Sequence, residues 1–403
     1  MKILFVTGNY LPVKKGGIEN YVHRLALILK ENNFEIEVSA LNIGDNEHFF
    51  YENIKVYNLK GSISSFENIL KEGNFDIVHF HEYSSYGGIE LPFFKIAKVY
   101  SKKVFFTFHL PYLTCYKNDF RFEDEVDCNI FNISERCAHC IFTTKMKDAG
   151  FSKNKMLLPF LETAFSILGK KKKLKLKVTN MHSVLLELID LCDEIFLIAD
   201  WFKKLLNSNG YNQDKLKLLP NSFNETSSFI KSETRLIKNK IVFVGRIQHQ
   251  KGLHLLTNAM HDLKNSSIEV DVYGNIIDEK YFNNCIEKYP FNYKGIISRD
   301  ELLSSLKNYD FLILPSVFTE MYPMVIQEAF SNSVPVIASA AKGNIDAIKD
   351  GADGFIFKYN DSENLAITIK KAYDKLFSGW KPSFALEGSK VDAIEETVSY
   401  YKI

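Results

Sequence analysis

Residues 310–339 read DFLILPSVFTEMYPMVIQEAFSNSVPVIAS. Two short apolar runs, 310–316 and 334–339, enclose a loop and a segment with a helical pattern. A near-continuous apolar run is typical of a strand that is buried on both faces of a parallel sheet. The stretch therefore predicts a strand, a helix and a second strand, in the alternation that characterises an α/β fold.

The same alternation runs along the chain in two sets. Further strands are predicted at residues 2–7, 35–41, 76–81, 103–109 and 194–199 in the first set, and at 241–246 and 268–274 in the second. Helices are predicted between the strands, among them 18–31 and 299–308, and Ser298 with Glu301 provides a capping box for the second of these. We predict two doubly wound, Rossmann-like α/β domains.

The length of the chain also favours two domains, because a single hydrophobic core rarely serves 403 residues. Residues 222–238 are polar and without pattern, so we place the boundary there. The predicted domains are 1–225 and 238–379. Residues 380–403 form either a helix that packs back on the first domain or a frayed end.

Charge and hydropathy limit the partners and the compartment. Lys plus Arg number 50 and Asp plus Glu 49, so no basic excess indicates nucleic acid as the main partner. The first residues, MKILFVTGNY, lack the pattern of a signal peptide, and no apolar run approaches the roughly 18 residues of a membrane span. We expect a cytoplasmic protein whose six cysteines are reduced.

Polar groups in the first set follow the predicted strands, at the edge where open parallel sheets bind ligands. The loop after the first strand ends in Gly16 and Gly17, just before a predicted helix. Glycines let a ligand approach the backbone, and a helix N-terminus favours an anion. The alternative is a plain tight loop. His81 and His109 end the third and fourth strands, and two histidines at one edge favour a function over a structural role.

The strand at 241–246 is followed by two cations, Arg246 and Lys251. Two cations held at a strand end suit a diphosphate. The alternative is a solvated charged loop.

The loop and helix after the strand at 310–316 carry the strongest signal. Glu320 lies on the loop, and Glu328 lies one turn into the helix that Met324 opens. The amide groups of Met324 and Val325 would be helix-start donors for a phosphate. Glu328 would accept two ribose hydroxyls, and Glu320 would hold a sugar ring. In the alternative, Glu320 caps the helix and Glu328 is an exposed surface residue.

With these residues in place, the chain resembles the retaining glycosyltransferases of family four, which have the two-domain GT-B fold. The resemblance covers nearly the whole chain and rests on the order of its segments. They are PVKKGGIENYVHRLA, DIVHFHEY, FFTFHLP, LPNS, VFVGRIQHQKGLHLL, the pair Glu320 and Glu328, and AKGNIDAIKDGADGFIF.

The resemblance implies two Rossmann-like domains that face each other across a cleft, and a role for each candidate residue. Gly17 would face the donor phosphate, His109 would contact the transferred sugar near the reacting carbon, and Arg246 and Lys251 would neutralise the leaving diphosphate. Glu320 would bind the sugar hydroxyls and Glu328 the ribose. Leu110, Tyr322, Pro323 and Ser333 depart from the pattern of many relatives and leave the donor sugar open.

The implied activity is transfer of a hexose-type sugar from a UDP- or GDP-sugar to a saccharide or lipid-linked saccharide acceptor, with retained configuration. Bacterial surface polysaccharide synthesis (capsule, O-antigen or lipopolysaccharide) is the expected setting, and the chemistry requires no metal cofactor. Three alternatives stay open: a sugar-nucleotide epimerase, a sugar phosphorylase and a non-catalytic protein that binds sugar nucleotides.

Four cysteines, Cys115, Cys128, Cys137 and Cys140, fall in the region after His109, and the last two have the spacing of many zinc sites. They could hold a structural Zn²⁺, with His139 or His109 as substitute ligands. The alternative is four reduced cysteines that pack as small apolar groups.

Residues 156–178 join an apolar stretch to a run of lysines. Such a segment could lie on an anionic membrane surface, at the inner face of the cell membrane. The alternative is a core helix followed by a solvated lysine turn.

Overall fold

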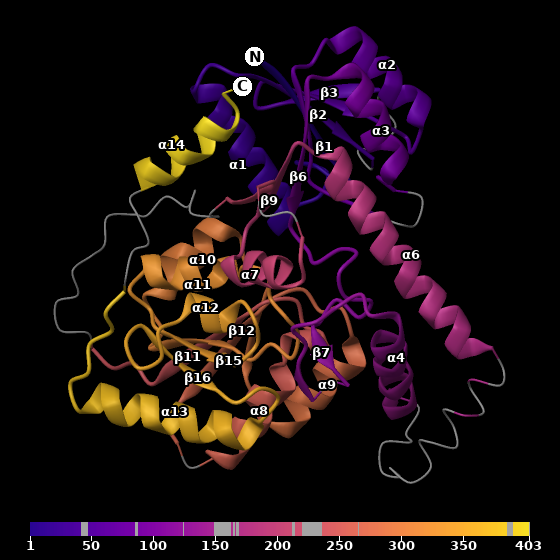
Figure 1. Ribbon diagram of the computed structural model, residues 1–403. Coiled ribbons are helices and arrows are strands. Elements are labelled where there is room, and N and C mark those ends of the chain that lie inside the picture. The colour runs from indigo at the N-terminus through magenta and orange to yellow at the C-terminus, as the bar shows by residue number, and fades with distance from the viewer. Residues whose placement is uncertain are drawn as a thin grey trace. The chain divides into compact units, whose positions relative to one another are not determined.

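The computed structural model describes residues 1–41, 47–84, 88–123, 125–148, 163, 166, 169–211, 214–219, 236–264, 266–384 and 390–402. The chain divides into two compact units (Figure 1). Unit 1 comprises Met1–Pro220 together with Thr397–Ile403, and unit 2 comprises Asn221–Glu396.

Unit 1 is built on an eight-stranded sheet with the order β10-β9-β6-β5-β1-β2-β4-β3. Its strands are β1 (Lys2–Thr7), β2 (Glu35–Ala40), β3 (His48–Tyr51), β4 (Ile54–Asn58), β5 (Ile77–Phe80), β6 (Lys103–Phe108), β9 (Glu194–Leu197) and β10 (Leu216–Leu218). All neighbours pair in parallel except β3 and β4, which form an antiparallel pair at the edge. Parallel pairing brings the carboxyl ends of β1, β5 and β6 to one edge.

The helices of unit 1 follow its strands. They are α1 (Gly17–Glu31), α2 (Ile63–Gly73), α3 (Leu91–Tyr100), α4 (Ser134–Asp148), α6 (Lys170–Leu191) and α7 (Asp200–Ser208). In α1 the residues Tyr21, Leu25 and Leu29 recur every four positions and are buried, so one face of this helix joins the core. A small hairpin of β7 (Arg121–Phe122) and β8 (Val126–Asp127) precedes α4, which packs against α6.

The end of the chain completes the core of unit 1. α14 (Lys390–Tyr400) leads to Tyr401, which is fully buried. The Tyr401 hydroxyl lies 2.7 Å from His79 Nδ1, and its ring stacks on Phe196. Residues more than 300 positions apart thus share one core.

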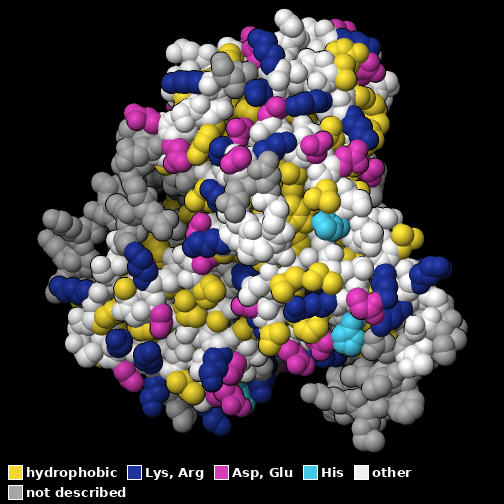
Figure 2. All heavy atoms as spheres, in the orientation of Figure 1, with side chains coloured by type: hydrophobic (Ala, Val, Ile, Leu, Met, Phe, Trp, Pro, Cys, Tyr) yellow, Lys and Arg dark blue, Asp and Glu magenta, His cyan; other side chains and the backbone are white. Residues whose placement is uncertain are grey.

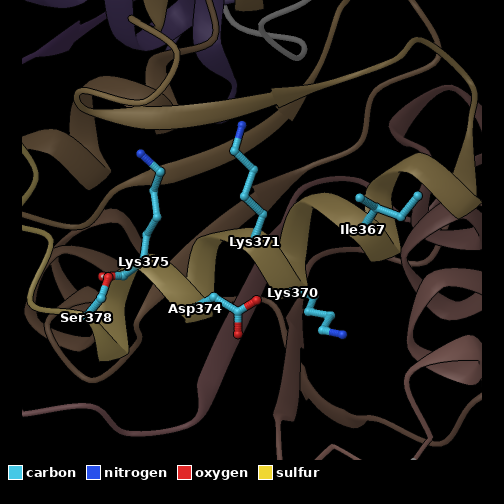
Figure 3. A pocket seen from close by; sticks show the side chains of 6 residues that line it. All are labelled: Ile367, Lys370, Lys371, Asp374, Lys375 and Ser378. Atoms are coloured by element: carbon cyan, nitrogen blue, oxygen red, sulfur yellow. The ribbon is translucent and has the colours of Figure 1, made fainter.

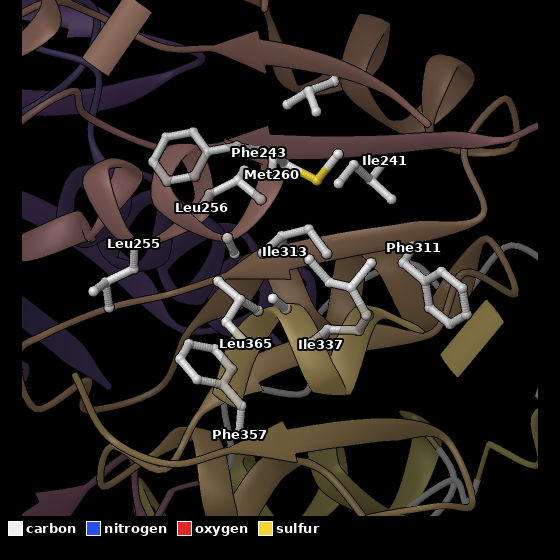
Figure 4. Packing of buried hydrophobic residues seen from close by; sticks show 14 of the residues in the cluster. Ile241, Phe243, Leu255, Leu256, Met260, Phe311, Ile313, Ile337, Phe357 and Leu365 are labelled. Atoms are coloured by element: carbon white, nitrogen blue, oxygen red, sulfur yellow. The ribbon is translucent and has the colours of Figure 1, made fainter. Parts of the chain in front are cut away.

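Unit 2 has a six-stranded, fully parallel sheet with the order β13-β12-β11-β14-β15-β16. Its strands are β11 (Lys240–Val244), β12 (Glu269–Tyr273), β13 (Asn292–Gly295), β14 (Phe311–Leu314), β15 (Val336–Ser339) and β16 (Gly354–Phe357). Its helices are the 3₁₀ turn η2 (His249–Lys251), α8 (Leu253–Asp262), α9 (Glu279–Lys288), α10 (Arg299–Leu306), α11 (Met324–Ser331), α12 (Asn344–Ala347) and α13 (Ser362–Phe377). α8 and α13 pack together, and Figure 4 shows their side chains meeting those of the sheet, as in Leu256, Leu365 and Phe243.

The predicted α/β fold is confirmed, and all nine predicted strands are present with ends shifted by at most a few residues. The capping box is also present, since Ser298 accepts from the Glu301 amide and Glu301 accepts from the Ser298 amide. Five strands of the two large sheets went unpredicted: β3, β4, β10, β13 and β16. β3, β10 and β13 are short, partly exposed edge strands, and β4 alternates buried with half-buried residues, so these four lack the two-sided apolar run of a central strand. β16 has only four residues and begins with a glycine. Within the described residues, no helix is long and apolar enough to cross a membrane.

Candidate functional site

A lysine–glutamate pair lies at the strand ends of unit 2. Lys251, the last residue of η2 after β11, donates from Nζ to Glu320 Oε1 at 2.6 Å. The Ser316 hydroxyl, just beyond β14, donates to the same oxygen at 2.7 Å. The two charged side chains keep only 19% and 11% of their surface exposed. Their mutual attraction is therefore little weakened by water, and both are held in one geometry.

Two glycines allow the backbone to form this pair. Gly252 has φ +74°, and a Cβ there would lie 1.8 Å from the carbonyl oxygen of Pro315. Gly343 has φ +86°, and its Cβ would lie 2.0 Å from the carbonyl oxygen of Glu320. Any side chain at either position would displace the loop that carries Glu320 or the turn that carries Lys251. The sequence analysis did not single out these two glycines. Both lie in segments that carried the family resemblance, where each directly follows a lysine, and that position could have identified them.

Glu328 is buried on α11, which begins at Met324 as predicted. Its side chain is 9% exposed, and Arg299 Nε donates to its Oε1 at 3.0 Å. Pro323 is the N-cap, and no side chain caps the helix, so Met324 and Val325 present amides that have no intrahelical acceptor. The alternative in which Glu328 is exposed and Glu320 caps the helix is therefore wrong.

Arg246 lies two residues beyond β11 and is exposed. Within the described part of the chain its side chain makes no hydrogen bond or ion pair. The two predicted cations therefore differ: Arg246 is exposed to solvent, whereas Lys251 is paired with Glu320. Arg299 and Ser316 are further polar groups of this region that the sequence analysis missed.

Three histidines gather in unit 1, His79 within β5 and the other two just beyond β5 and β6. His81 and His109 directly follow β5 and β6, and His81 Nδ1 lies 3.1 Å from His109 Nε2. The ring of His79 lies 4.0 Å from that of His81, and the Tyr21 ring meets His109 edge-on at 4.7 Å. The sequence prediction that His81 and His109 share one edge is confirmed.

Burial sets the charge of these rings. His79 and His81 are fully buried and His109 is 5% exposed. Loss of hydration lowers the pKa of His109 to about 3, and it holds the pKa values of His79 and His81 well below 6.5. All three imidazoles are therefore neutral at neutral pH. His81 Nε2 is buried and has no hydrogen-bond partner among the described residues.

The N-terminus of α1 already faces a carboxylate. Gly16 is the N-cap, and a Cβ on it would lie 2.4 Å from Glu19 Oε2. Glu82 accepts a hydrogen bond from the Gly8 amide at 2.9 Å, and burial raises the pKa of its carboxyl group. Gly16 and Gly17 open α1 as predicted, but Glu19 and Glu82, which the sequence analysis missed, lie close to the loops around them.

The four cysteines line one small cavity in unit 1, together with Lys117, Arg121 and Arg136. All six cysteines of the chain are free. As they stand, no three or more His, Cys, Asp or Glu side chains in the described ranges are grouped to hold a metal ion. His139 is directed elsewhere, with Nε2 3.0 Å from Glu123 Oε1, and His109 contacts His81.

The basic run of residues 156–178 is described only at 163, 166 and 169–178. Its lysines do not form a solvated turn, because they begin the helix α6. Lys171 and Lys175 both form ion pairs with Glu135 of α4. The apolar half of this prediction lies largely outside the described residues.

Other surface features do not compete with these clusters. One hollow, of about 380 Å³, is lined by Ile367, Lys370, Lys371, Asp374, Lys375 and Ser378. Figure 3 shows that these side chains all come from α13 or its end, so the hollow is an open groove along one helix. On the face in Figure 2, Lys and Arg are interspersed with Asp and Glu, in agreement with the net charge of +1.

Comparison with known proteins gives a family for part of the chain. Residues 224–375, which include Lys251, Glu320 and Glu328, match the family described as Glycosyl transferases group 1. Over 407 aligned residues the chain is 23% identical to an uncharacterized 41.2 kDa protein in the cps region of Klebsiella pneumoniae, covering 96% of this chain and 97% of that protein. It is 30% identical over 148 residues to an Escherichia coli UDP-Gal:alpha-D-GlcNAc-diphosphoundecaprenol alpha-1,3-galactosyltransferase, covering 34% of this chain and 38% of that enzyme.

Solved structures show the same architecture. The Anabaena protein HepE in complex with UDP and glucose superposes with a TM-score of 0.59 at 13% identity, covering 100% of this chain and 94% of that chain. The lipopolysaccharide outer core galactosyltransferase WaaB gives 0.57 at 15% identity, covering 100% and 95%. The chain has the GT-B fold of these proteins, and the match over 224–375 places a group 1 glycosyltransferase region in unit 2.

Proposed function

With a group 1 glycosyltransferase region in unit 2 as the premise, we propose that this protein is a retaining glycosyltransferase that takes a hexose-type sugar from a nucleotide-sugar donor. The observation that carries the proposal is the Lys251–Glu320 pair, held at the strand ends of that region by Ser316 and by two close backbone approaches. The relative whose structure holds UDP and glucose supports a UDP-sugar as the first donor to test.

Each group of unit 2 suits one part of such a donor. The ammonium of Lys251 and the exposed guanidinium of Arg246 would neutralise the diphosphate, with the amides of Met324 and Val325 as further donors. Once Lys251 turns to the phosphate, Glu320 is left to accept hydrogen bonds from sugar hydroxyls. Glu328 would accept the ribose hydroxyls while Arg299 holds its second side.

The proposed reaction forms a bond from an acceptor hydroxyl to the anomeric carbon and breaks the bond to the nucleoside diphosphate on the same face. The hydroxyl proton passes to an oxygen of the departing diphosphate. The largest charge in the transition state develops on the departing diphosphate, so preorganised cations contribute most to the rate. His109 of unit 1 would contact the transferred sugar as a neutral imidazole, able to donate or accept a hydrogen bond without adding charge.

The acceptor is proposed to be a saccharide or a lipid-linked saccharide of a surface polysaccharide. The K. pneumoniae relative lies in a cps region, and the E. coli relative acts on a diphosphoundecaprenol-linked sugar. A reaction at a membrane surface fits such an acceptor. We propose that the exposed lysines of α6, Lys172, Lys173 and Lys177, face anionic lipid, whereas Lys171 and Lys175 pair with Glu135.

The test is a donor screen with the purified protein in buffer without added metal ions and without chelator. UDP- and GDP-hexoses are each incubated with short saccharides and with diphosphopolyprenol-linked sugars, and release of nucleoside diphosphate is followed together with product. We expect acceptor-dependent release from one donor and a product with the anomeric configuration of that donor by NMR. A rearranged sugar nucleotide formed without acceptor would indicate an epimerase instead, and turnover that requires inorganic phosphate would indicate a phosphorylase.

A further inference from the structure

We propose that Cys115, Cys128, Cys137 and Cys140 form a structural zinc site in unit 1. Their shared cavity has a volume of about 30 Å³, which is room for one ion or one water molecule. The inference concerns the folding of unit 1 and is independent of the proposed sugar transfer.

The four thiols come from three separate pieces of chain. Cys115 lies in the loop after β6, and Cys128 directly follows β8. Cys137 and Cys140 are three residues apart in the first two turns of α4, which puts them on one face of that helix. One helical pair and two loop ligands from converging segments make a tetrahedral four-thiolate arrangement reachable.

The surroundings of the cavity suit a negative centre. Four thiolates around Zn²⁺ carry a net charge of about −2, which is costly to bury without compensation. Lys117, Arg121 and Arg136 all line the cavity. Lys117 pairs with Asp119 and Arg121 pairs with Asp127, so both cations are held beside the cavity.

One backbone amide points at a sulfur of the cluster. The amide of Glu123, in the β7–β8 hairpin, donates to Cys140 Sγ at 3.2 Å. Backbone N–H groups that point at sulfur stabilise a metal-bound thiolate and fix its orientation. Two other thiols donate locally: Cys128 Sγ to the Ile130 carbonyl oxygen at 2.9 Å, and Cys115 Sγ to Asp119 Oδ1 at 3.9 Å. Both of these hydrogen bonds would have to be given up when the thiolates bind a metal.

The segment has little regular structure of its own, and two buried side chains, Phe120 and Phe131, anchor it by packing against Trp201 and Tyr211. β7 and β8 have two residues each, and the buried apolar cluster between α4 and α6 consists of Ala138, Ile141, Leu174 and Val178. A long connection with so little regular structure is usually fixed by some further constraint. Because the thiols are not yet grouped at ligand distance, binding would draw the four sulfurs inward to about 2.3 Å from the metal.

The test begins with the full-length, reduced protein purified without chelators. Elemental analysis is expected to give about one zinc per chain. After zinc is removed, titration with Co²⁺ alone is expected to give an intense thiolate-to-cobalt charge-transfer band and tetrahedral d–d bands, saturating at about one equivalent. This spectrum reports sulfur ligation in the wild-type chain, so it does not depend on whether a variant folds.

Two variants locate the site. Cys137→Ser with Cys140→Ser should lose the zinc and the cobalt bands, whereas the control Cys285→Ser, at a buried cysteine of unit 2 outside the cavity, should retain both. Chelator should lower the melting temperature of the wild type and of the control, but not that of the double variant. A reduced wild-type protein that contains no zinc and gives no cobalt band would overturn the proposal in favour of four apolar thiols.

Discussion

Unit 1 carries a cluster of three buried, neutral imidazoles in and just beyond β5 and β6, whereas unit 2 carries two ion pairs, one beyond β11 and β14 and one between α10 and α11. His109 and His81 face each other among aromatic rings. Lys251 with Glu320 and Arg299 with Glu328 retain full charges under partial burial. The two units have the same sheet architecture, so the difference lies in the residues that follow each strand.

The difference indicates a division of labour. The histidines of the unit 1 cluster stay unprotonated, because burial disfavours the charged imidazolium. In unit 2 each carboxylate is held by a charged partner. A phosphate could take the place of the carboxylate beside the cation, and a hydroxyl could take the place of the cation beside the carboxylate. Unit 2 is therefore suited to an anionic ligand, and unit 1 to an uncharged one. The predictions below test this contrast.

The largest effect is expected from the cations of unit 2. Lys251→Ala and Arg246→Ala should each lower the catalytic constant about 30- to 1000-fold, or 2–4 kcal/mol of barrier, by removing charge that stabilises the departing diphosphate. Steady-state kinetics with the donor from the screen gives the measurement. Lys370→Ala, in the groove of α13, is the matched control and should leave the rate unchanged. Turnover within a few-fold of wild type in both variants would contradict the assignment.

A smaller effect is expected from the backbone that supports the ion pair. Gly252→Ala should reduce the free energy of unfolding by about 2–3 kcal/mol, because it adds a clash with Pro315 to the strain of a positive φ. Gly379→Ala has a similar φ of +87° but open space around the added Cβ, so it should cost about 1 kcal/mol. Urea denaturation followed by fluorescence compares the two. Equal losses would show that the approach to Pro315 does not constrain unit 2.

The smallest effect concerns pH and unit 1. Because burial depresses the pKa values of its histidines, unfolding takes up protons below about pH 6.5, and stability falls as the pH falls. Each such histidine lowers the free energy of unfolding by up to about 1.4 kcal/mol for each pH unit below its unfolded pKa. Between pH 6.5 and pH 5.5, the free energy of unfolding should therefore fall by about 1 kcal/mol less in His79→Asn than in wild type.

The control is His261→Asn, since His261 is about half exposed on α8 of unit 2. It should show the wild-type dependence on pH in denaturation curves. A slope in His79→Asn as steep as that of wild type would refute the linkage.

The sequence predicted candidate residues that directly follow a buried strand or a helix start. It did not predict residues that reach the same region only through contacts between elements distant in the sequence. Lys251 and Glu320 were found because each follows an apolar strand, and Glu328 because it follows a helix start. Arg299 was missed because its pairing with Glu328 joins two helices 29 residues apart. Tyr401 could not be assigned to His79 from any local pattern, since the contact spans 322 residues.

The edge strands were also missed because their local sequence carries no clear signal. β13 reads NYKG and is mostly exposed, so its residues lack the apolar pattern that identifies a central strand. The lysines at the start of α6 looked like a solvated turn because the ion pairs to Glu135, which tie two of them to a neighbouring helix, are not visible in one dimension.

The central claim, that unit 2 binds a nucleotide-sugar donor, is tested most directly by a metal-free thermal-shift panel of nucleoside diphosphates and their sugars on wild type and Glu328→Ala. We predict that one diphosphate and its sugar raise the melting temperature of the wild type and that the shift is largely lost in the variant, because the ribose then lacks its carboxylate partner. Stabilisation by no nucleotide, or equal stabilisation of both proteins, would contradict the account of this site.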